Sequence, residues 1–268
     1  MNLAIRDALV RVQGSALAHD VPVDARAGTF AWRGRTRDVA EFAWESPVAG
    51  AVYGTLLNDR AALAALGEAA GGPPYKAPPK APVLYVKPRN TRSAYGWPIV
   101  VPAGTPALAM GACLGVVIGR TACRVRAADA LDFVAGYTVA NDVCVPHESF
   151  YRPMVRYRCR DGFCPLGPWV VARRHVADPD GLELRVEIDG VVRQRANTGT
   201  FVRTVARLLA DVTEFMTLAP GDVLLTGVPA DAPLAQPGQR VAIAIDGVGT
   251  LVNTVVAADA FAGVKARQ

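Results

Sequence analysis

Two Asp-Gly pairs, at residues 189–190 and 246–247, constrain the fold of this chain more than any other feature. The runs on either side of each pair are rich in valine, isoleucine and leucine, as in LELRVEI before the first pair and VAIAI before the second. Asp-Gly is favoured in two-residue β-hairpin turns, because these turns need backbone conformations with positive φ. The sequence therefore predicts two hairpins in the C-terminal half of the chain.

Most other predicted elements are also strands, and they are short and separated by Gly and Pro turns. The apolar run at 106–119 is shorter than the ~18 residues of a membrane span, and it predicts a fully buried strand. Strands are further predicted over 83–88, 97–102, 135–143 and 167–174. Because strands and helices do not alternate, a doubly wound parallel sheet is not expected.

Three helices are predicted. The segment 58–72 is rich in alanine and leucine, with Asn58 as its N-cap and Gly71-Gly72 as its stop. A short helix is predicted over 126–134. The segment 200–216 predicts an amphipathic helix with one apolar stripe, formed by Phe201, Val205, Leu208, Leu209, Val212 and Phe215.

Composition excludes several classes of function. The net charge is +5, but lysines and arginines are scattered without a run of five, so no nucleic-acid arm is predicted. The sequence has neither a GxGxxG motif nor a P-loop, so no nucleotide cofactor is expected. The five cysteines form no CxxC pair, which argues against a disulfide framework or a zinc site. No membrane segment or signal-peptide pattern is found, and a cytoplasmic location is expected.

Four motifs occur in a specific order: GYTVANDV, RDGFCPLGPWVV, RQRANTGTFV and MTLAPGDVLLTGVP. Together they resemble the fumarylacetoacetate hydrolase family over residues 50–258. Three further stretches, PYKAPPKAPVLYVKPRNT, ESFYRP and CRDGFCPLG, resemble the first half of its bacterial members that act as isomerase/decarboxylases in homoprotocatechuate (4-hydroxyphenylacetate) degradation.

This resemblance implies an α+β fold that is mainly β, a mixed β-sandwich roll with a few helices. The chain then divides into an N-terminal extension, residues 1–48, and a fumarylacetoacetate hydrolase-like domain, residues 49–268. A homodimer, or a heterodimer with a paralogous subunit, is also implied.

The family's chemistry implies a divalent metal, Mg or Mn, held by three carboxylates. The metal chelates a 2-oxo acid and stabilises the enolate that forms when a C–C bond breaks or a proton moves. In this chain the first two ligand positions fall on Gly111 and Cys113, which leaves Asp142. A glycine has no ligand atom, and a thiol is a soft ligand poorly matched to magnesium. A His and Glu that the family often carries on a short lid helix fall near Ala62 and Ala65.

The resemblance also implies a set of groups that bind a small anionic 2-oxo acid. Asp142, Arg158 and Lys87 are expected to be catalytic. The expected substrate-binding residues are Arg89, Arg152, Arg160, Asn197 and Thr198. Arginine suits this role because its planar guanidinium holds a carboxylate at two points. His147 is either a general base or an exposed structural histidine.

Two functions remain open at this point. The chain is expected to be a subunit that decarboxylates or isomerises 5-carboxymethyl-2-oxo-hex-3-ene-1,7-dioate through a stabilised enolate. In the alternative, it is a catalytically reduced, metal-poor subunit that pairs with a metal-bearing paralogue.

Overall fold

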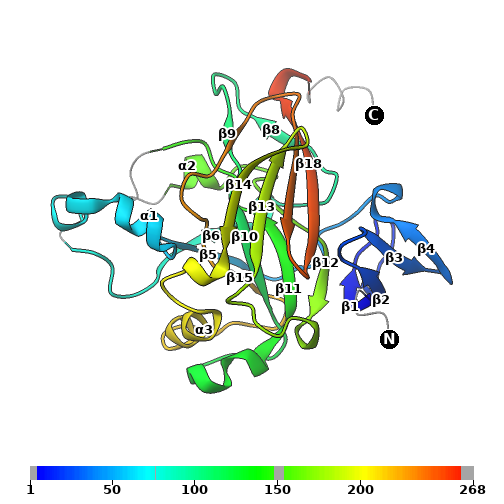
Figure 1. Cartoon of the computed structure of the whole chain (residues 1–268), viewed down its shortest axis with the longest axis horizontal. Coiled ribbons are helices and arrows are strands. Elements are labelled where there is room, and N and C mark those ends of the chain that lie inside the picture. Colours follow the sequence, from blue (N-terminus) through cyan, green and yellow to red (C-terminus); the bar gives the residue numbers. More distant parts are fainter. Residues whose placement is uncertain (1–4, 76, 148–153, 261–268) are drawn as a thin grey trace.

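The computed structural model describes residues 5–75, 77–147 and 154–260, and it consists of two packed sheets with a few short helices (Figure 1). The larger sheet has the strand order β4-β3-β2-β1-β12-β11-β10-β15-β5-β6, and β7 pairs with β12 beside it. Its strands are β1 (Ile5–Val10), β2 (His19–Asp24), β3 (Thr29–Trp32), β4 (Arg35–Asp38), β5 (Val52–Leu56), β6 (Val83–Lys87), β7 (Arg92–Ala94), β10 (Ala112–Ile118), β11 (Val134–Asn141), β12 (Cys164–Ala172) and β15 (Val223–Leu225).

The second sheet has the order β14-β13-β17-β18-β8 and lies across β10, β11 and β12 (Figure 1). Its strands are β8 (Ile99–Val101), β13 (Glu183–Ile188), β14 (Val191–Asn197), β17 (Arg240–Ile245) and β18 (Gly249–Ala257), and a small separate ladder joins β9 (Leu108–Ala109) to β16 (Leu234–Ala235). Large side chains such as Tyr137 and Trp169 from the first sheet and Ile243 and Leu251 from the second are at most 1% exposed. The main core thus lies between two sheets, and the predicted mixed β-sandwich roll is confirmed.

The helices cover the rim of this sandwich rather than forming a layer of their own (Figure 1). The α-helices are α1 (Arg60–Ala65), α2 (Val155–Arg158) and α3 (Val205–Thr213). The 3-10 helices are η1 (Val39–Glu41), η2 (Gly67–Gly71), η3 (Arg89–Thr91), η4 (Ala127–Phe133), η5 (Arg173–His175) and η6 (Thr198–Thr200). None of the helices in the described part of the chain is long and apolar enough to cross a membrane.

The strand predictions are confirmed where turn chemistry and burial agree. β13 and β14 form the hairpin expected around Asp189-Gly190, whose φ angles are 53° and 77°. β17 and β18 form the second hairpin. Every residue of β10 is buried, as predicted, but the apolar run at 106–119 is not one strand, because β9 ends at Ala109 and β10 begins at Ala112. These predictions hold because sheet pairing and apolar burial favour the same strand conformation in these segments.

All three helix predictions need correction. The segment 58–72 is not one helix: α1 ends early and continues as η2 from Gly67, whose φ is +48°. The N-cap of α1 is Asp59 rather than Asn58, because the Asp59 carboxylate accepts from the Ala62 amide. The segment predicted over 126–134 takes the 3-10 form as η4.

A further correction concerns the third predicted helix, α3, which is shorter than its apolar stripe predicted. Val205 and Val212 are buried on the helix as expected, with Leu208 and Leu209. Phe201 is buried but precedes the helix. Phe215 lies beyond its end and is 66% exposed, so its assignment to the stripe was wrong. The periodicity predicted which side is apolar but not where the helix ends.

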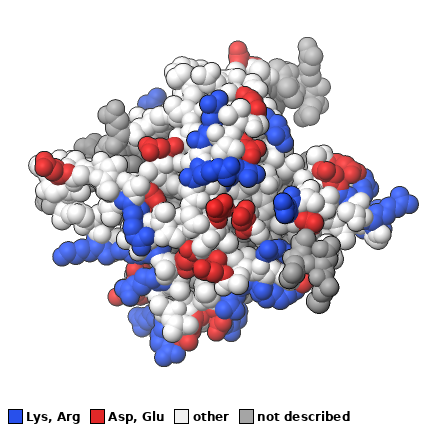
Figure 2. Space-filling model, in the orientation of Figure 1, with Lys and Arg blue, Asp and Glu red and all other residues white. Residues whose placement is uncertain are grey.

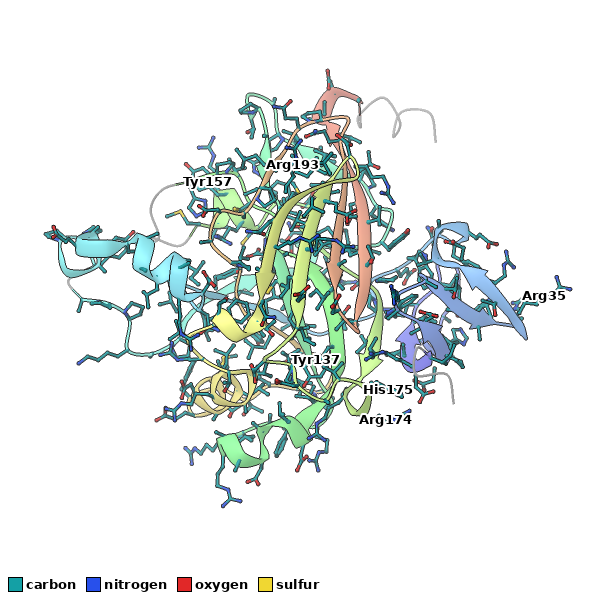
Figure 3. All side chains as sticks on the ribbon, in the orientation of Figure 1. Arg35, Tyr137, Tyr157, Arg174, His175 and Arg193 are labelled. Carbon is teal, nitrogen blue, oxygen red and sulfur yellow. The ribbon has the colours of Figure 1, made fainter. Side chains whose placement is uncertain are left out.

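The N-terminal strands extend the larger sheet. Backbone pairing joins Ala8 of β1 to Val171 of β12. The Asp7 carboxylate contacts Arg174 and lies 3.1 Å from His175 Nε2, both on η5 (Figure 3). A fully buried Trp44 also belongs to the main core. Whether residues 1–48 form a separate domain stays a prediction.

Surface charges of both signs are interspersed over the face shown in Figure 2. The molecule shows no broad basic stripe on this face, in line with the scattered lysines and arginines of the sequence.

Candidate active site

A cavity of about 460 Å³ opens between α1, β5, β6, the residues after β11 and the segment 228–232. Its wall is largely apolar, with a few polar side chains. The polar and charged residues that line it are Thr55, Tyr85, Asp142, His147, Arg158 and Asp231. A concave, mainly apolar site with a few convergent polar groups is typical of small-molecule binding.

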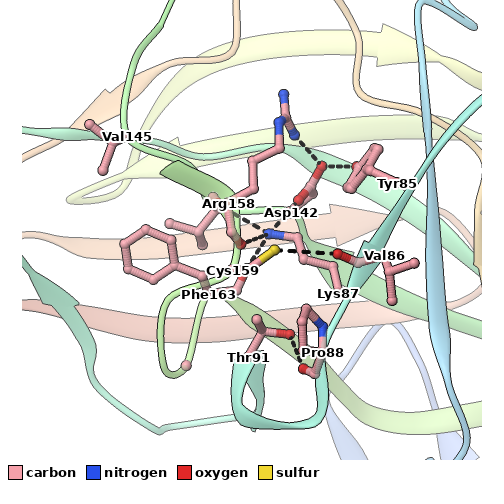
Figure 4. Close-up of polar contacts among 12 residues, drawn as sticks. Tyr85, Val86, Lys87, Pro88, Thr91, Asp142, Val145, Arg158, Cys159 and Phe163 are labelled. Atoms are coloured by element: carbon pink, nitrogen blue, oxygen red, sulfur yellow. Dashed lines mark hydrogen bonds and ion pairs between the residues drawn. The ribbon is translucent and has the colours of Figure 1, made fainter. Parts of the chain in front are cut away.

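Asp142 is the centre of the charged wall. β11 places it directly after Asn141, and its amide donates to the Gly111 carbonyl at 2.8 Å. Its side chain is fully buried. One carboxylate oxygen, Oδ1, lies 2.6 Å from Lys87 Nζ. The other, Oδ2, accepts from Arg158 Nη1 at 2.8 Å and from the Tyr85 hydroxyl (Figure 4). The carboxylate therefore joins three side chains that come from β6 and α2.

Lys87 is buried as deeply as Asp142. Besides its contact with Asp142, Nζ donates to the carbonyls of Val143, Arg158 and Phe163, each at 2.9 Å (Figure 4). These carbonyls follow β11, end α2 and precede β12. An ammonium group has three protons to donate, so these three bonds and the carboxylate contact satisfy it fully.

Tyr85 reaches Asp142 because the neighbouring strand leaves room for its ring. Gly54 of β5 lies directly opposite Tyr85 in the β5–β6 pair. A Cβ atom at position 54 would overlap the Tyr85 ring. The Arg158 guanidinium lies over this ring, 5.0 Å from its centroid, which is a cation–π distance.

Burial and charge set the protonation of this cluster. Burial by itself would raise the pKa of Asp142, but Lys87 and Arg158 outweigh it and hold that pKa below its usual range. Burial, followed by the charge of Asp142, raises the pKa of Tyr85 well above its usual value. Burial works to lower the pKa of Arg158, and Asp142 more than offsets this, so the net shift is upward. At neutral pH Asp142 is therefore a carboxylate, Arg158 a cation and Tyr85 a neutral phenol.

The residues at the expected metal position do not fit a divalent metal. A Cβ atom at Gly111 would lie 2.6 Å from the Asp142 carbonyl oxygen and 2.9 Å from Val228 Cγ2, so the wall is closed there. Burial raises the pKa of the Cys113 thiol to about 12, which keeps it neutral. In the described ranges, no three His, Cys, Asp or Glu side chains come together as a metal-binding group.

The structure brings none of the four described members of the expected substrate-binding set to the cavity. Arg89 is exposed on η3, and Arg160 Nε donates to the Arg156 carbonyl. Asn197 caps η6, and the Thr198 hydroxyl donates to the Pro179 carbonyl. None of these expected residues lines the cavity as it stands. Arg152 lies outside the described residues, and the roles of all five stay predictions.

Sequence reasoning missed Tyr85 and Thr55. Tyr85 precedes Lys87 by two residues, and residues two apart on a strand face the same side, so a signal was present. The Thr55 hydroxyl is buried at the cavity and has no hydrogen-bond partner among the described residues. No local motif distinguishes this threonine from a core residue of β5.

α1 forms one side of the cavity and presents Ala62 and Ala65 to it. Asp59 fixes this helix in place: besides capping α1, its carboxylate accepts from the Ala230 amide at 3.2 Å and from the Thr200 hydroxyl at 2.8 Å. The helix therefore shapes the cavity without contributing an acid or a base from these two alanine positions.

The β-sandwich fold and its buried charged pocket are those of a mainly β enzyme. Comparison with family models identifies the family. The model for the fumarylacetoacetate (FAA) hydrolase C-terminal domain matches residues 51–256. The chain belongs to the fumarylacetoacetate hydrolase family.

Two kinds of relatives are informative. A 4-hydroxyphenylacetate degradation bifunctional isomerase/decarboxylase from Salmonella dublin is 44% identical over 213 residues, which is 80% of this chain and 48% of the relative. The chain thus spans about half the length of the curated relatives it matches first. The solved 5-carboxymethyl-2-hydroxymuconate delta-isomerase from Mycobacterium smegmatis is 32% identical, with a TM-score of 0.75, covering 93% of this chain and 98% of that one.

A third relative was solved with ligands. The maleylpyruvate hydrolase from Sphingobium sp. SYK-6, in complex with manganese(II) and pyruvate, is 25% identical with a TM-score of 0.71. The match covers 93% of this chain and 99% of that one.

Proposed function

We propose that this chain binds a 2-oxo acid with several carboxylates in the 460 Å³ cavity and decarboxylates or isomerises it through an enolate. The observation that supports this proposal most is the position of Arg158. Its guanidinium is buried at the cavity wall and is held by Asp142. A fixed guanidinium in a site of low dielectric stabilises developing negative charge more strongly than it would in water. The names of the relatives support the reaction class.

The substrate we assign is 5-carboxymethyl-2-oxo-hex-3-ene-1,7-dioate. In decarboxylation, the C–C bond to the departing carboxylate breaks and carbon dioxide leaves. The bonding electron pair moves through the C3–C4 double bond to the 2-oxo oxygen and gives a dienolate, which is then protonated on carbon. N–H groups of Arg158 stabilise the enolate oxygen, and the Thr55 hydroxyl donates to a substrate carboxylate. Asp142 and Lys87 act by holding Arg158 in place.

His147 is the candidate for proton movement on carbon. Its ring lines the cavity and stacks on Tyr157, with centroids 5.4 Å apart. Burial lowers the pKa of His147 from its usual value. A neutral imidazole at pH 7 can accept a proton, which isomerisation requires.

An assay of the purified chain with Arg158→Ala tests this function. Loss of one preorganised donor to a developing oxyanion lowers kcat by roughly 10²- to 10³-fold. Arg35→Ala is the matched control, because Arg35 is exposed at the far tip of the β3–β4 hairpin (Figure 3). Carbon dioxide release that is equally fast in wild type and Arg158→Ala would refute the proposal.

A second function has its own support. The chain spans about half the length of its isomerase/decarboxylase relatives. Ala62 and Ala65 of α1 stand where the family resemblance places a His and a Glu. These facts favour a reduced subunit that works with a paralogous one, as a heterodimer rather than a homodimer. Turnover that appears only after a paralogue is added would support it, and light scattering would give the oligomeric state. A cytoplasmic location belongs to both proposals and is testable by cell fractionation.

A further inference from the structure

In the buried cluster around Asp142, two basic side chains already contact the single carboxylate. Lys87 Nζ lies 2.6 Å from Oδ1, and Arg158 Nη1 lies 2.8 Å from Oδ2. The Tyr85 hydroxyl donates to Oδ2 as well (Figure 4). Oδ2 therefore accepts from two protein donors, whereas Oδ1 is in ion-pair contact with Lys87 but accepts no hydrogen bond among the described residues. The cluster has two basic side chains for one acidic one.

The ammonium group of Lys87 occupies a position surrounded by oxygen atoms that could otherwise be ligands of a metal ion. One carboxylate oxygen and the carbonyl oxygens of Val143, Arg158 and Phe163 surround its ammonium nitrogen. Oxygen donors of these two kinds are the ones that hard cations such as Mg²⁺ or Mn²⁺ take. A divalent ion at Asp142 would have to displace this ammonium or stand beside it and be repelled.

The residues at the two expected metal-ligand positions, Gly111 and Cys113, supply no ligand that could hold a divalent metal instead. The backbone at Gly111 packs against Asp142 and Val228 too closely for a longer side chain. The Cys113 sulfur accepts from the Gly227 amide at 3.4 Å and is fully buried. A neutral thiol turned into the protein is neither a hard ligand nor accessible from the cavity.

We propose that this pocket binds its acid ligand without a divalent metal, with Arg158 as the cation at the cavity wall, Lys87 as a fully buried cation of the same cluster, and Asp142 as the counter-ion that positions them. The inference uses the cavity of the proposed function but not its reaction. It departs from the metal-dependent chemistry that the family fold implies. Asp142 is then a positioning residue and not a metal ligand.

Direct metal binding tests the proposal in the wild-type chain. The protein is stripped with chelator and titrated with Mn²⁺, and free Mn²⁺ is followed by electron paramagnetic resonance. The titration is repeated with pyruvate present, because a 2-oxo acid can supply two metal ligands of its own. We expect no stoichiometric Mn²⁺ uptake in either case. One Mn²⁺ per chain, with or without pyruvate, would overturn the proposal.

Lysine ammonium NMR gives a second readout that needs no variant to fold. The sequence has four lysines, at positions 76, 80, 87 and 265, and the Lys87 ammonium is the deeply buried one among those described. Its signal is expected to show slow hydrogen exchange and to keep its width when Mn²⁺ is added. Paramagnetic broadening of this signal, with the Lys80 signal unaffected, would contradict the proposal.

The outcomes separate this inference from the proposed reaction. Mn²⁺ uptake would refute the metal-free pocket and leave the reaction open. An absence of turnover, with no Mn²⁺ bound, would refute the reaction for the isolated chain and support the metal-free pocket.

Discussion

Gly54 lies opposite Tyr85 across the β5–β6 pair, and the Tyr85 ring fills the space that a side chain at position 54 would need. The hydrogen bond from Tyr85 to Asp142 thus depends on a residue that touches neither the carboxylate nor the cavity.

Replacing this glycine tests the relationship. Gly54→Ala is expected to displace the ring and lower the free energy of unfolding by about 1–3 kcal/mol, the usual range for overpacking. Urea unfolding measures the change. Gly71→Ala is the control, because no atom lies within 4 Å of its added Cβ, and about 1 kcal/mol or less is expected there. Equal midpoints for Gly54→Ala and wild type would show that the ring relaxes freely.

Removing the charge of Asp142 should be far more damaging. Asp142→Asn leaves Lys87 and Arg158 buried without a counter-charge, which typically costs about 3–5 kcal/mol. Thermal and urea unfolding measure the loss. Asp20→Asn serves as control, since Asp20 is exposed, and about 0.5 kcal/mol or less is expected at such a site. A small effect of Asp142→Asn would mean that the cations are more hydrated than their burial indicates.

The pH dependence of stability follows from the lowered pKa of Asp142. The folded-state pKa lies below that of the unfolded chain, about 3.9. The stabilisation is therefore complete above that pH and is lost as the pH falls through the folded-state pKa. Carbon-13 NMR of the side-chain carboxyl is expected to give a midpoint below 3.9. A midpoint above this value would reverse the sign and show that burial outweighs the two cations.

Thiol labelling tests the environment of Cys113. Burial raises the pKa of Cys113 and of Cys164 to about 12, whereas Cys123 is exposed. The thiolate is the reactive form. Ellman's reagent at pH 8 is therefore expected to label Cys123 first, and Cys123→Ser to remove the fast phase. Labelling of Cys113 as fast as that of Cys123 would show that the family's ligand position is open to solvent.

The sequence predicted where Asp142 lies along the chain, whereas the roles of Asp142, Lys87 and Arg158 stay predictions. The segment 135–143 was predicted to be a strand that delivers Asn141 and Asp142 at its end, and Asp142 follows β11 directly. The placement of Lys87 and Arg158 beside it came from the family resemblance. No pattern along the chain states that these residues meet.

The parts that were missed depend on contacts between distant segments. Asn58 has the chemistry of an N-cap, but its side-chain amide donates to the Thr226 carbonyl at 2.7 Å, and Asp59 caps the helix instead. Phe215 continues the apolar period of α3 but stands beyond the last helical residue. The role of Gly54 is visible only once Tyr85 is placed opposite it.

The pairing of β1 with β12 also keeps one edge of β12 from being exposed to other chains. Without β1, the stretch of β12 around Val170 and Val171 would present unpaired backbone amides and carbonyls along an apolar strand. Such an open edge is a template for β-strands of other chains. β1 covers this edge in the structure, so a chain that lacks β1 is expected to self-associate more readily than the full chain.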